Sequence, residues 1–367
     1  MSTRPDGSEK EEQRLVIASF RGGILTCLLS GGTPVQLDYA AGEAAHSPVG
    51  GIYAARVKTV RENVGAAFLD LGEGLTAWYS LSADPEPVLL REKKPGKTRL
   101  VPGDELLVKV KRAGGDVKKP AVVSRFPERK DPELLKRAAF VKVPGLVKAP
   151  EPVWHLLARK ADSVVTDLPE IYTALTGEPV PEENAWREKL PEALRGQEAP
   201  VYVAGTRVPV SFYRKKGISL RAVYSLETAV ASATERKVWL KSGGFLVIDR
   251  TEAMTVIDVN SGKNEKGQNP EETFLRTDRE AAAEIMRQLR LRNLSGIVLV
   301  DFINLRDPEH QRELMKLLKE KAAEDPVQTE AVDMTKLNLV EIVRRKQGRP
   351  FAEQLRVKAE NRKENTD

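Results

Sequence analysis

Two apolar runs in the last third of this chain each end in an aspartate, and the pattern around them restricts the fold to an α/β layer. Met254–Asp258 and Gly296–Asp301 are rich in β-branched residues. A third run, Phe245–Asp249, precedes the first across a connection of hairpin length. Helical spacing separates the two runs, and Asp307-Pro308 has the aspartate cap and the proline that begin another helix. The order strand, strand, helix, strand, helix predicts a central sheet with helices packed against it.

Local signals set two further expectations for this region. Thr277 stands three residues before Glu280, which is the spacing of a capping box, so a helix is expected to begin there. Gly296–Asp301 is a continuous apolar run and therefore predicts a strand that is buried on both faces.

The two terminal aspartates suit a site for one hard cation. Strands lie about 4.8 Å apart, so carboxylates at the ends of neighbouring strands reach a shared ion. Mg²⁺ binds through one or two carboxylates and takes its other ligands from water and substrate phosphate. Asn260 follows Asp258 by two residues and shares its face, where its amide could bind a phosphate. The plainer reading, in which Asp258 and Asp301 only cap loops or helix ends, stays open, and Asp249 is expected to pair structurally.

In the first half of the chain the apolar residues recur with a different spacing. Residues 15–40 alternate strand-like runs with glycine turns, as in a small hairpin. Residues 47–125 contain about five short apolar runs between turns, which suits a small closed barrel. From about residue 130 the spacing becomes helical, beginning with Asp131-Pro132 as cap and first helical residue.

Composition narrows the class of protein. Hydrophobic residues make up 41% and charged residues 31% of the 367 residues, which fits a globular protein. Neither a membrane-spanning run nor a secretory signal is evident, so a cytoplasmic location is expected. The single cysteine, Cys27, is expected to be a small buried residue, and His155 and His310 are not expected to be ligands. The net charge of +6 is a weak hint of a polyanionic partner.

Several ordered blocks in the last third resemble the RNase E/G family of endoribonucleases. The blocks are Lys237–Gly244, Ile248–Ala253, Thr255–Gly262, Arg287–Leu294 and Val300–Ile303. The resemblance implies that Asp258 and Asp301 hold a magnesium ion and that Asn260 assists at the scissile phosphate. It also implies a deoxyribonuclease-like α/β catalytic domain over 231–355, followed by a tail at 356–367.

A weaker resemblance reaches the N-terminal half, at Gly51–Tyr53 and Ala66–Asp70. It implies a multidomain α/β protein: a disordered tail at 1–14, an OB-fold RNA-binding barrel at 46–126, and an RNase H-like domain at 15–45 and 127–230 into which the barrel is inserted. Phe68 and Trp78 would stack on RNA bases, and each stacking contact would contribute about 1–3 kcal/mol of binding free energy. Lys118 or Lys119 would contact the RNA backbone. The alternative for Phe68 is a place in the barrel core. The arginine cluster Arg287, Arg290 and Arg292 is expected to contact RNA phosphates.

The sequence departs from the family pattern at two places. The family's 5′-end sensor carries an arginine-threonine pair, whereas the nearest segment here, Gly145–Ala149, has Lys148 and Ala149 in that place. Lysine lacks the planar fork that grips a phosphate, and alanine has no hydroxyl. No Cys-Pro-x-Cys occurs, so any homodimer is expected to form without zinc.

These observations predict a Mg²⁺-dependent endoribonuclease that cleaves single-stranded RNA without 5′-end sensing and leaves 5′-phosphate products. The alternative is a non-catalytic RNA-binding protein or RNA chaperone on the same fold. A deoxyribonuclease is a third possibility, which the RNA-binding barrel disfavours.

Overall fold

The computed structural model describes residues 11–41, 49–85, 87–91, 99–112, 114, 119–180, 201–215, 217–262 and 270–356. These residues belong to two compact units. One is drawn from Met1–Ala45, Val153–Lys346 and Pro350–Asp367, and the other from His46–Pro152 and Gln347–Arg349. The second unit thus takes in residues 127–152, which the sequence analysis assigned to the RNase H-like domain.

The second unit contains a closed five-stranded barrel. Its strands pair in the circular order β4-β5-β6-β8-β7 and back to β4, with β6 and β8 parallel and the other neighbours antiparallel. The strands are β4 (Ile52–Arg61), β5 (Ala66–Gly72), β6 (Leu75–Ser80), β7 (Glu105–Arg112) and β8 (Ala121–Val123). This closure confirms the expected barrel and is consistent with an OB-like fold.

Two further elements extend the barrel unit. Strand β9 (Gly145–Lys148) pairs antiparallel with β4. Helix α1 (Pro132–Phe140) begins where the sequence predicts, since the Asp131 carboxylate accepts a hydrogen bond from the Glu133 amide at 3.0 Å. Short 3-10 turns occupy Glu62–Val64 and Pro127–Lys130.

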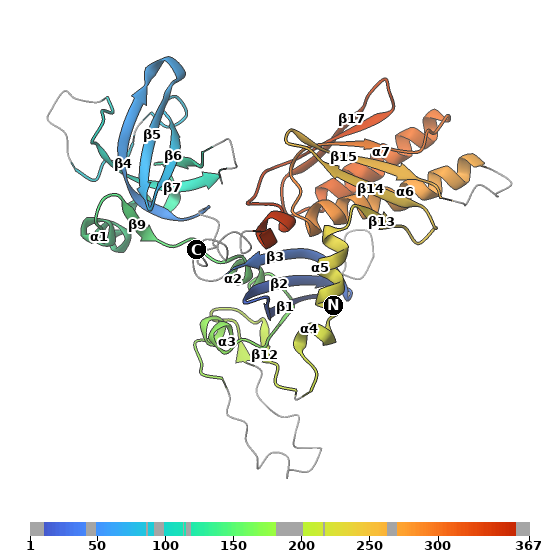
Figure 1. The fold of residues 1–367 in the computed structure, drawn as a ribbon, viewed down its shortest axis with the longest axis horizontal. Coiled ribbons are helices and arrows are strands. Elements are labelled where there is room, and N and C mark those ends of the chain that lie inside the picture. The colour runs from blue at the N-terminus through green and yellow to red at the C-terminus, as the bar shows by residue number, and fades with distance from the viewer. Residues whose placement is uncertain are drawn as a thin grey trace, which may run out of the picture. The chain divides into compact units, whose positions relative to one another are not determined.

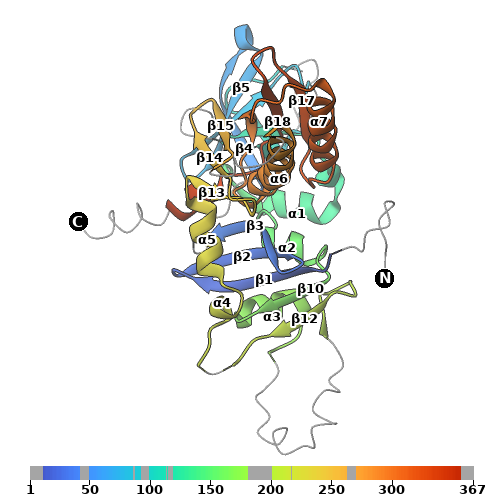
Figure 2. The same ribbon diagram turned by 90° about the vertical axis from the view of Figure 1, so that its right-hand side faces the viewer.

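The first unit begins with a six-stranded sheet in the order β11-β12-β10-β1-β2-β3, and Figure 2 shows its longer strands one below another. Its strands are β1 (Gln13–Phe20), β2 (Gly23–Ser30), β3 (Thr33–Ala40), β10 (Ser163–Thr166), β11 (Val201–Tyr202) and β12 (Pro209–Phe212). Its helices are α2 (Val153–Ala158), α3 (Pro169–Thr176), α4 (Leu220–Val223) and α5 (Leu226–Thr234). Separate apolar clusters pack on the two faces, so this sheet is covered on both sides. Cys27 lies in one cluster, and burial raises the pKa of its thiol to about 12, as expected of a packing residue.

The C-terminal sheet of the same unit has the order β13-β14-β15-β16-β18-β17. Its strands are β13 (Lys237–Trp239), β14 (Phe245–Arg250), β15 (Met254–Asn260), β16 (Gly296–Asp301), β17 (Thr329–Met334) and β18 (Leu339–Arg344). Helices α6 (Pro270–Leu291) and α7 (Pro308–Ala323) lie against one face, as Figure 1 shows, and build the core with it. The expected α/β layer is confirmed.

Two expectations for this sheet are wrong. The strand β16 is not buried on both faces, because alternate residues such as Ile297, at 48% exposure, point away from the helices. Helix α6 starts at Pro270 rather than Thr277, so there is no capping box. The Thr277 hydroxyl instead donates to the Thr273 carbonyl one turn back, and Glu280 accepts hydrogen bonds from the amides of Lys241 and Ser242. Glu271 and Glu272 supply acidic side chains at the true N-terminus of the helix.

Candidate functional site

The structure brings Asp258 and Asp301 together on the open face of the C-terminal sheet. Strands β15 and β16 run parallel, and the two aspartates are register partners at their carboxyl ends. Both side chains are exposed, while the adjacent Ile257 and Val300 are fully buried against the helices. Since register partners in a sheet point to the same side, the two carboxylates face the same region of solvent.

Asn260 completes the polar group at this sheet end. It lies two residues beyond Asp258 on β15, and its Nδ2 donates a hydrogen bond to Asp258 Oδ2 at 2.7 Å. The side-chain amide has two hydrogens, so the second N–H is not used by this contact. Within the described parts of the chain, neither aspartate forms an ion pair with a lysine, arginine or histidine.

The donor chemistry here fits a hard divalent cation. The two aspartates offer carboxylate oxygens alone, and an exposed site leaves room for the several waters that Mg²⁺ retains. No group of three or more His, Cys, Asp or Glu side chains forms a ready-made cage among the described residues. The other ligands of a cation held by these two carboxylates would be waters or oxygens of a bound anion.

Asp249 behaves as expected of a structural residue. Both of its carboxylate oxygens accept hydrogen bonds from Arg236, each at 2.5 Å. This bidentate contact lowers the pKa of the Asp249 carboxyl, chiefly through the side-chain hydrogen bond to Arg236. The carboxylate is thus occupied by a guanidinium and does not join the pair formed by Asp258 and Asp301.

A buried carboxyl lies beside the segment that follows Asp301. Asp278 on α6 is fully buried, and its Oδ1 accepts a hydrogen bond from the Ile303 amide at 3.1 Å. Its Oδ2 has no hydrogen-bond partner among the described residues. Burial raises the pKa of Asp278 to about 8, so the neutral acid dominates at neutral pH.

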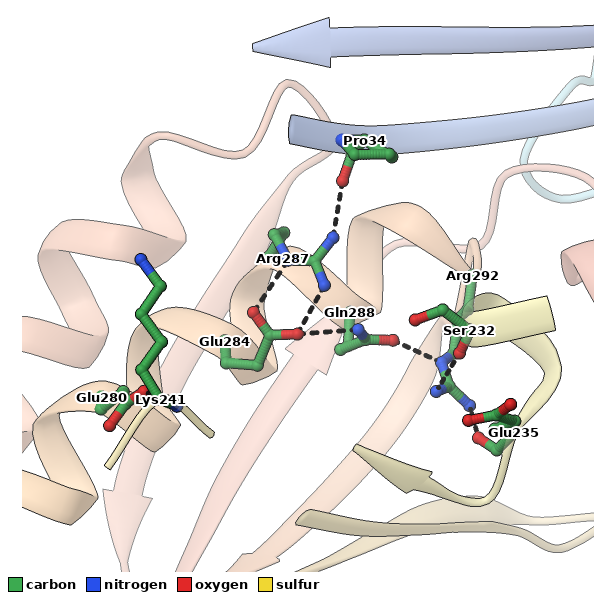
Figure 3. A network of polar contacts seen from close by, with 9 residues as sticks. All are labelled: Pro34, Ser232, Glu235, Lys241, Glu280, Glu284, Arg287, Gln288 and Arg292. Atoms are coloured by element: carbon green, nitrogen blue, oxygen red, sulfur yellow. Dashed lines mark hydrogen bonds and ion pairs between the residues drawn. The ribbon is translucent and has the colours of Figure 1, made fainter. Parts of the chain in front are cut away.

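Arg292, one of the three arginines that are expected to contact RNA phosphates, is hydrogen-bonded inside the fold. Figure 3 shows Arg292 donating to Gln288 Oε1 at 2.5 Å and to the carbonyls of Ser232 and Glu235 at 3.0 and 2.7 Å. Arg292 is only 7% exposed, and burial lowers the pKa of its guanidinium to about 10. Its position does not support an RNA contact, since its donors serve carbonyl groups inside the fold.

Arg287 is hydrogen-bonded to Glu284 and Pro34, and Arg290 is half-buried on the same helix. Arg287 donates twice to Glu284, at 2.6 and 2.8 Å, and once to the Pro34 carbonyl of β3 at 2.6 Å (Figure 3). Its neutralised guanidinium lines a cavity of about 550 Å³ that contains neither candidate aspartate. Arg290 is half-buried, and burial lowers the pKa of its guanidinium. Arg287 thus joins α6 to β3, and Arg292 joins the end of α6 to α5 and to Glu235 just after α5.

Of the two histidines that the structure describes, neither lies on the strands that carry Asp258 and Asp301. His310 on α7 is half-buried, with Nδ1 3.6 Å from a Glu271 oxygen. His155 lies on α2 beside the Trp154 ring, in the other half of the unit.

Phe68 and Trp78 lie on the outside of the barrel. They are register partners on β5 and β6, and each alternates with buried residues such as Leu69 and Tyr79 that fill the interior. Both rings are half-buried, and Lys119 Nζ lies 5.0 Å from the Phe68 ring centroid. These three side chains form a combined aromatic and cationic surface. Lys118 lies outside the described residues.

Sequence reasoning missed a second aromatic pair, on the same sheet face as the aspartates. Trp239 on β13 and Phe245 on β14 are register partners, and their ring centroids are 5.4 Å apart. The signal was the alternation Lys237-Val238-Trp239, which places the lysine and the tryptophan on one face of a strand.

Comparison with known proteins gives a consistent picture. The profile of the Ribonuclease E/G family matches residues 156–347, which is more than half of the chain and includes both aspartates. Ribonuclease G of Salmonella typhimurium (strain SL1344) is 43% identical over 124 residues, which are 34% of this chain and 25% of that protein. Ribonuclease E of Synechocystis sp. is 30% identical over 253 residues, 69% of this chain and 36% of that protein. The chain thus matches about a quarter to a third of the length of these relatives. None of the helices that the structure describes has the length and apolar character needed to cross a membrane.

Proposed function

Because this chain belongs to the ribonuclease E/G family, we propose that it is a Mg²⁺-dependent endoribonuclease that cleaves single-stranded RNA in RNA processing or decay. The observation that carries the proposal is the register pairing of Asp258 with Asp301 on an exposed sheet face. The relatives named ribonuclease G and ribonuclease E support an activity on RNA.

Asp258 and Asp301 are the residues that would hold the cation. A bound Mg²⁺ supplies an activated water and positive charge beside the reacting phosphate. Mn²⁺, which also prefers oxygen ligands, is expected to substitute for it.

Asn260 is proposed to position the scissile phosphate. One hydrogen of its Nδ2 is held by Asp258 at 2.7 Å, which fixes the amide next to the carboxylate pair. The other hydrogen can donate to a non-bridging phosphate oxygen. Water forms a new bond to phosphorus and gives up one proton, the bond from phosphorus to the 3′-oxygen breaks, and the leaving oxygen takes up a proton. The products carry a 5′-phosphate and a 3′-hydroxyl.

The barrel is proposed to bind unpaired RNA. Phe68 and Trp78 offer ring faces for stacking, and Lys119 adds a positive charge for the backbone. In this proposal the barrel is an OB fold, the sheet of β1–β3 and β10–β12 is RNase H-like, and the C-terminal sheet with α6 and α7 is deoxyribonuclease-like. The strand orders are compatible with these assignments.

We further propose that cleavage does not depend on the 5′ end. Lys148 is exposed at the end of β9 and Ala149 follows it, so this position lacks a guanidinium and a hydroxyl. Matched RNAs with one or three 5′-phosphates should be cleaved at equal rates. A large preference for the monophosphate would overturn this part of the proposal.

The central experiment compares Asp258→Asn and Asp301→Asn with wild-type protein on a labelled single strand, with Mg²⁺ and with EDTA. Each variant should lose cleavage while its RNA affinity stays near the wild-type value, because the substitutions preserve side-chain shape. Asp249→Asn is the matched control, since it neutralises a strand-end carboxylate that is bound to Arg236. Cleavage at the wild-type rate by both aspartate variants would exclude the site.

The same assay separates the rival functions. A non-catalytic RNA-binding protein or chaperone would bind the strand but leave it intact at every metal concentration. A deoxyribonuclease would cleave DNA of the same sequence in preference to RNA. The intact group of Asp258, Asn260 and Asp301 favours catalysis over RNA binding alone, and the barrel with Phe68, Trp78 and Lys119 favours RNA over DNA as the substrate.

A further inference from the structure

An exposed tryptophan shares the open sheet face with the carboxylate pair. Trp239 is 66% exposed, although tryptophan is a large apolar side chain that is usually well covered. The ring of its register partner Phe245 meets it at an interplanar angle of 62°, in an edge-on contact. The Phe245 ring is half-buried and supports the indole from the strand next to it. About two thirds of the tryptophan surface is thus accessible to a ligand.

A lysine adds positive charge to this pair. Lys237 Nζ lies 3.5 Å from the Phe245 ring centroid and 3.9 Å from the Trp239 ring centroid. Both contacts are cation–π interactions, in which the ammonium lies over the two rings. An aromatic ring beside a cation is the combination that sequence-tolerant single-strand binding uses, with the ring under a base and the cation near the backbone.

The register of the sheet places this surface next to the aspartates. Phe245 pairs with Asn260, and the next residue on the same face of β14, Val247, pairs with Asp258. Asp258 pairs in turn with Asp301. Successive strands are about 4.8 Å apart, so the Trp239 backbone is about 10 Å from that of Asn260. That separation suits a nucleotide adjacent to the one whose phosphate is cut.

We propose that Trp239, supported by Phe245 and Lys237, stacks on the base of a nucleotide adjacent to the scissile phosphate. This inference rests on the proposed function, since the nucleotide is defined by the cut. The subsite accepts any base, because every base has a π face, and it fixes the position of the strand rather than its sequence.

The test pairs Trp239→Ala with RNAs that carry one abasic nucleotide, moved stepwise along both sides of the cut. Trp239→Ala should lower kcat/KM on intact RNA by about 5- to 100-fold. An abasic nucleotide at one position should lower the wild-type value by a similar factor. Combining the variant with that RNA should give little further loss, because both changes remove the same contact.

Two control variants separate stacking from general effects. Trp239→Phe keeps an aromatic ring and should retain most of the activity. Val343→Ala shortens another exposed apolar side chain of the same sheet and should stay within about twofold of wild type. The subsite would be overturned if Trp239→Ala cleaved RNA at the wild-type rate. It would also be overturned if the loss of kcat/KM in the variant multiplied with the loss caused by the abasic nucleotide at every position.

Binding measurements keep the subsite testable apart from catalysis. RNA affinities of wild type and Trp239→Ala are measured in EDTA with the same intact and abasic strands. If wild-type protein cleaves no RNA with Mg²⁺, the proposed function is rejected. If Trp239→Ala leaves every affinity and every rate unchanged, the subsite is rejected and the proposed function stands.

Discussion

Asp258 and Asp301 are register partners across two parallel strands, with no residue offset between them. Two carboxylates on adjacent strands of one sheet face repel each other, and their flanking residues Ile257 and Val300 are held in place by burial. The fold thus fixes a pair of like charges at the sheet end. Such an arrangement costs stability unless a cation is shared between them.

Neutralising one aspartate should stabilise the protein in the absence of metal. Asp301→Asn is expected to raise the free energy of unfolding in EDTA by roughly 0.5–1 kcal/mol, because it removes a like-charge pair. Wild-type protein should gain stability on addition of Mg²⁺, whereas the variant should gain much less. Thermal unfolding with and without Mg²⁺ measures both effects. Asp249→Asn, which breaks the contact to Arg236, should instead show no gain in EDTA. Equal Mg²⁺ responses in wild type and Asp301→Asn would contradict the shared site.

Removing an outer ring of the barrel should weaken RNA binding without unfolding the protein. Phe68→Ala and Trp78→Ala are each expected to cost about 1–3 kcal/mol of binding free energy to a single strand. Fluorescence anisotropy at fixed salt measures the affinity. Val101→Ala, which shortens a half-exposed valine of the same unit, should leave it unchanged. Wild-type affinity in both ring variants would assign Phe68 and Trp78 to packing.

Arg292 should prove to be a folding residue rather than an RNA contact. Arg292→Met leaves the carbonyls of Ser232 and Glu235 without their donors, so a loss of about 2–4 kcal/mol in the free energy of unfolding is expected. Urea unfolding measures this loss, and RNA affinity at low temperature should be unchanged. Arg276→Met, at an exposed position of the same helix, should have little effect on stability. A stable Arg292→Met protein with weakened RNA binding would restore the original prediction.

The strand-end aspartates could be placed from sequence because short stretches of the chain carry the signals: the β-type periodicity, the apolar runs and the order of strands and helices. Met254–Asp258 and Gly296–Asp301 became adjacent parallel strands as the α/β pattern requires. Trp239 was missed because a short strand of three residues carries little periodic signal. Its importance depends on the register with Phe245, which only the assembled sheet sets.

The failures of the sequence analysis share a cause, which is that long-range packing decides between local alternatives. Thr277 and Glu280 have capping-box spacing, yet the amides of Lys241 and Ser242 occupy the glutamate. Arg292 is part of a basic run, but α5 packs against it and takes up its donors. The apolar run at Gly296–Asp301 fits burial on two faces, whereas helices cover one face of that sheet.

Asp278 should make stability depend on pH in the direction opposite to a salt-bridged acid. Its folded pKa of about 8 exceeds the ordinary value of 3.8, so unfolding releases a proton between these limits. Stability is therefore lost as pH rises from about 4 to about 8, by at most about 1.4 kcal/mol per pH unit. Asp278→Asn keeps the acceptor for the Ile303 amide and should become progressively more stable than wild type over this range. Urea unfolding at several pH values tests this, with Glu330→Gln at an exposed position of β17 as the control. Parallel curves for wild type and Asp278→Asn would show that the buried carboxyl is ionised in the folded protein.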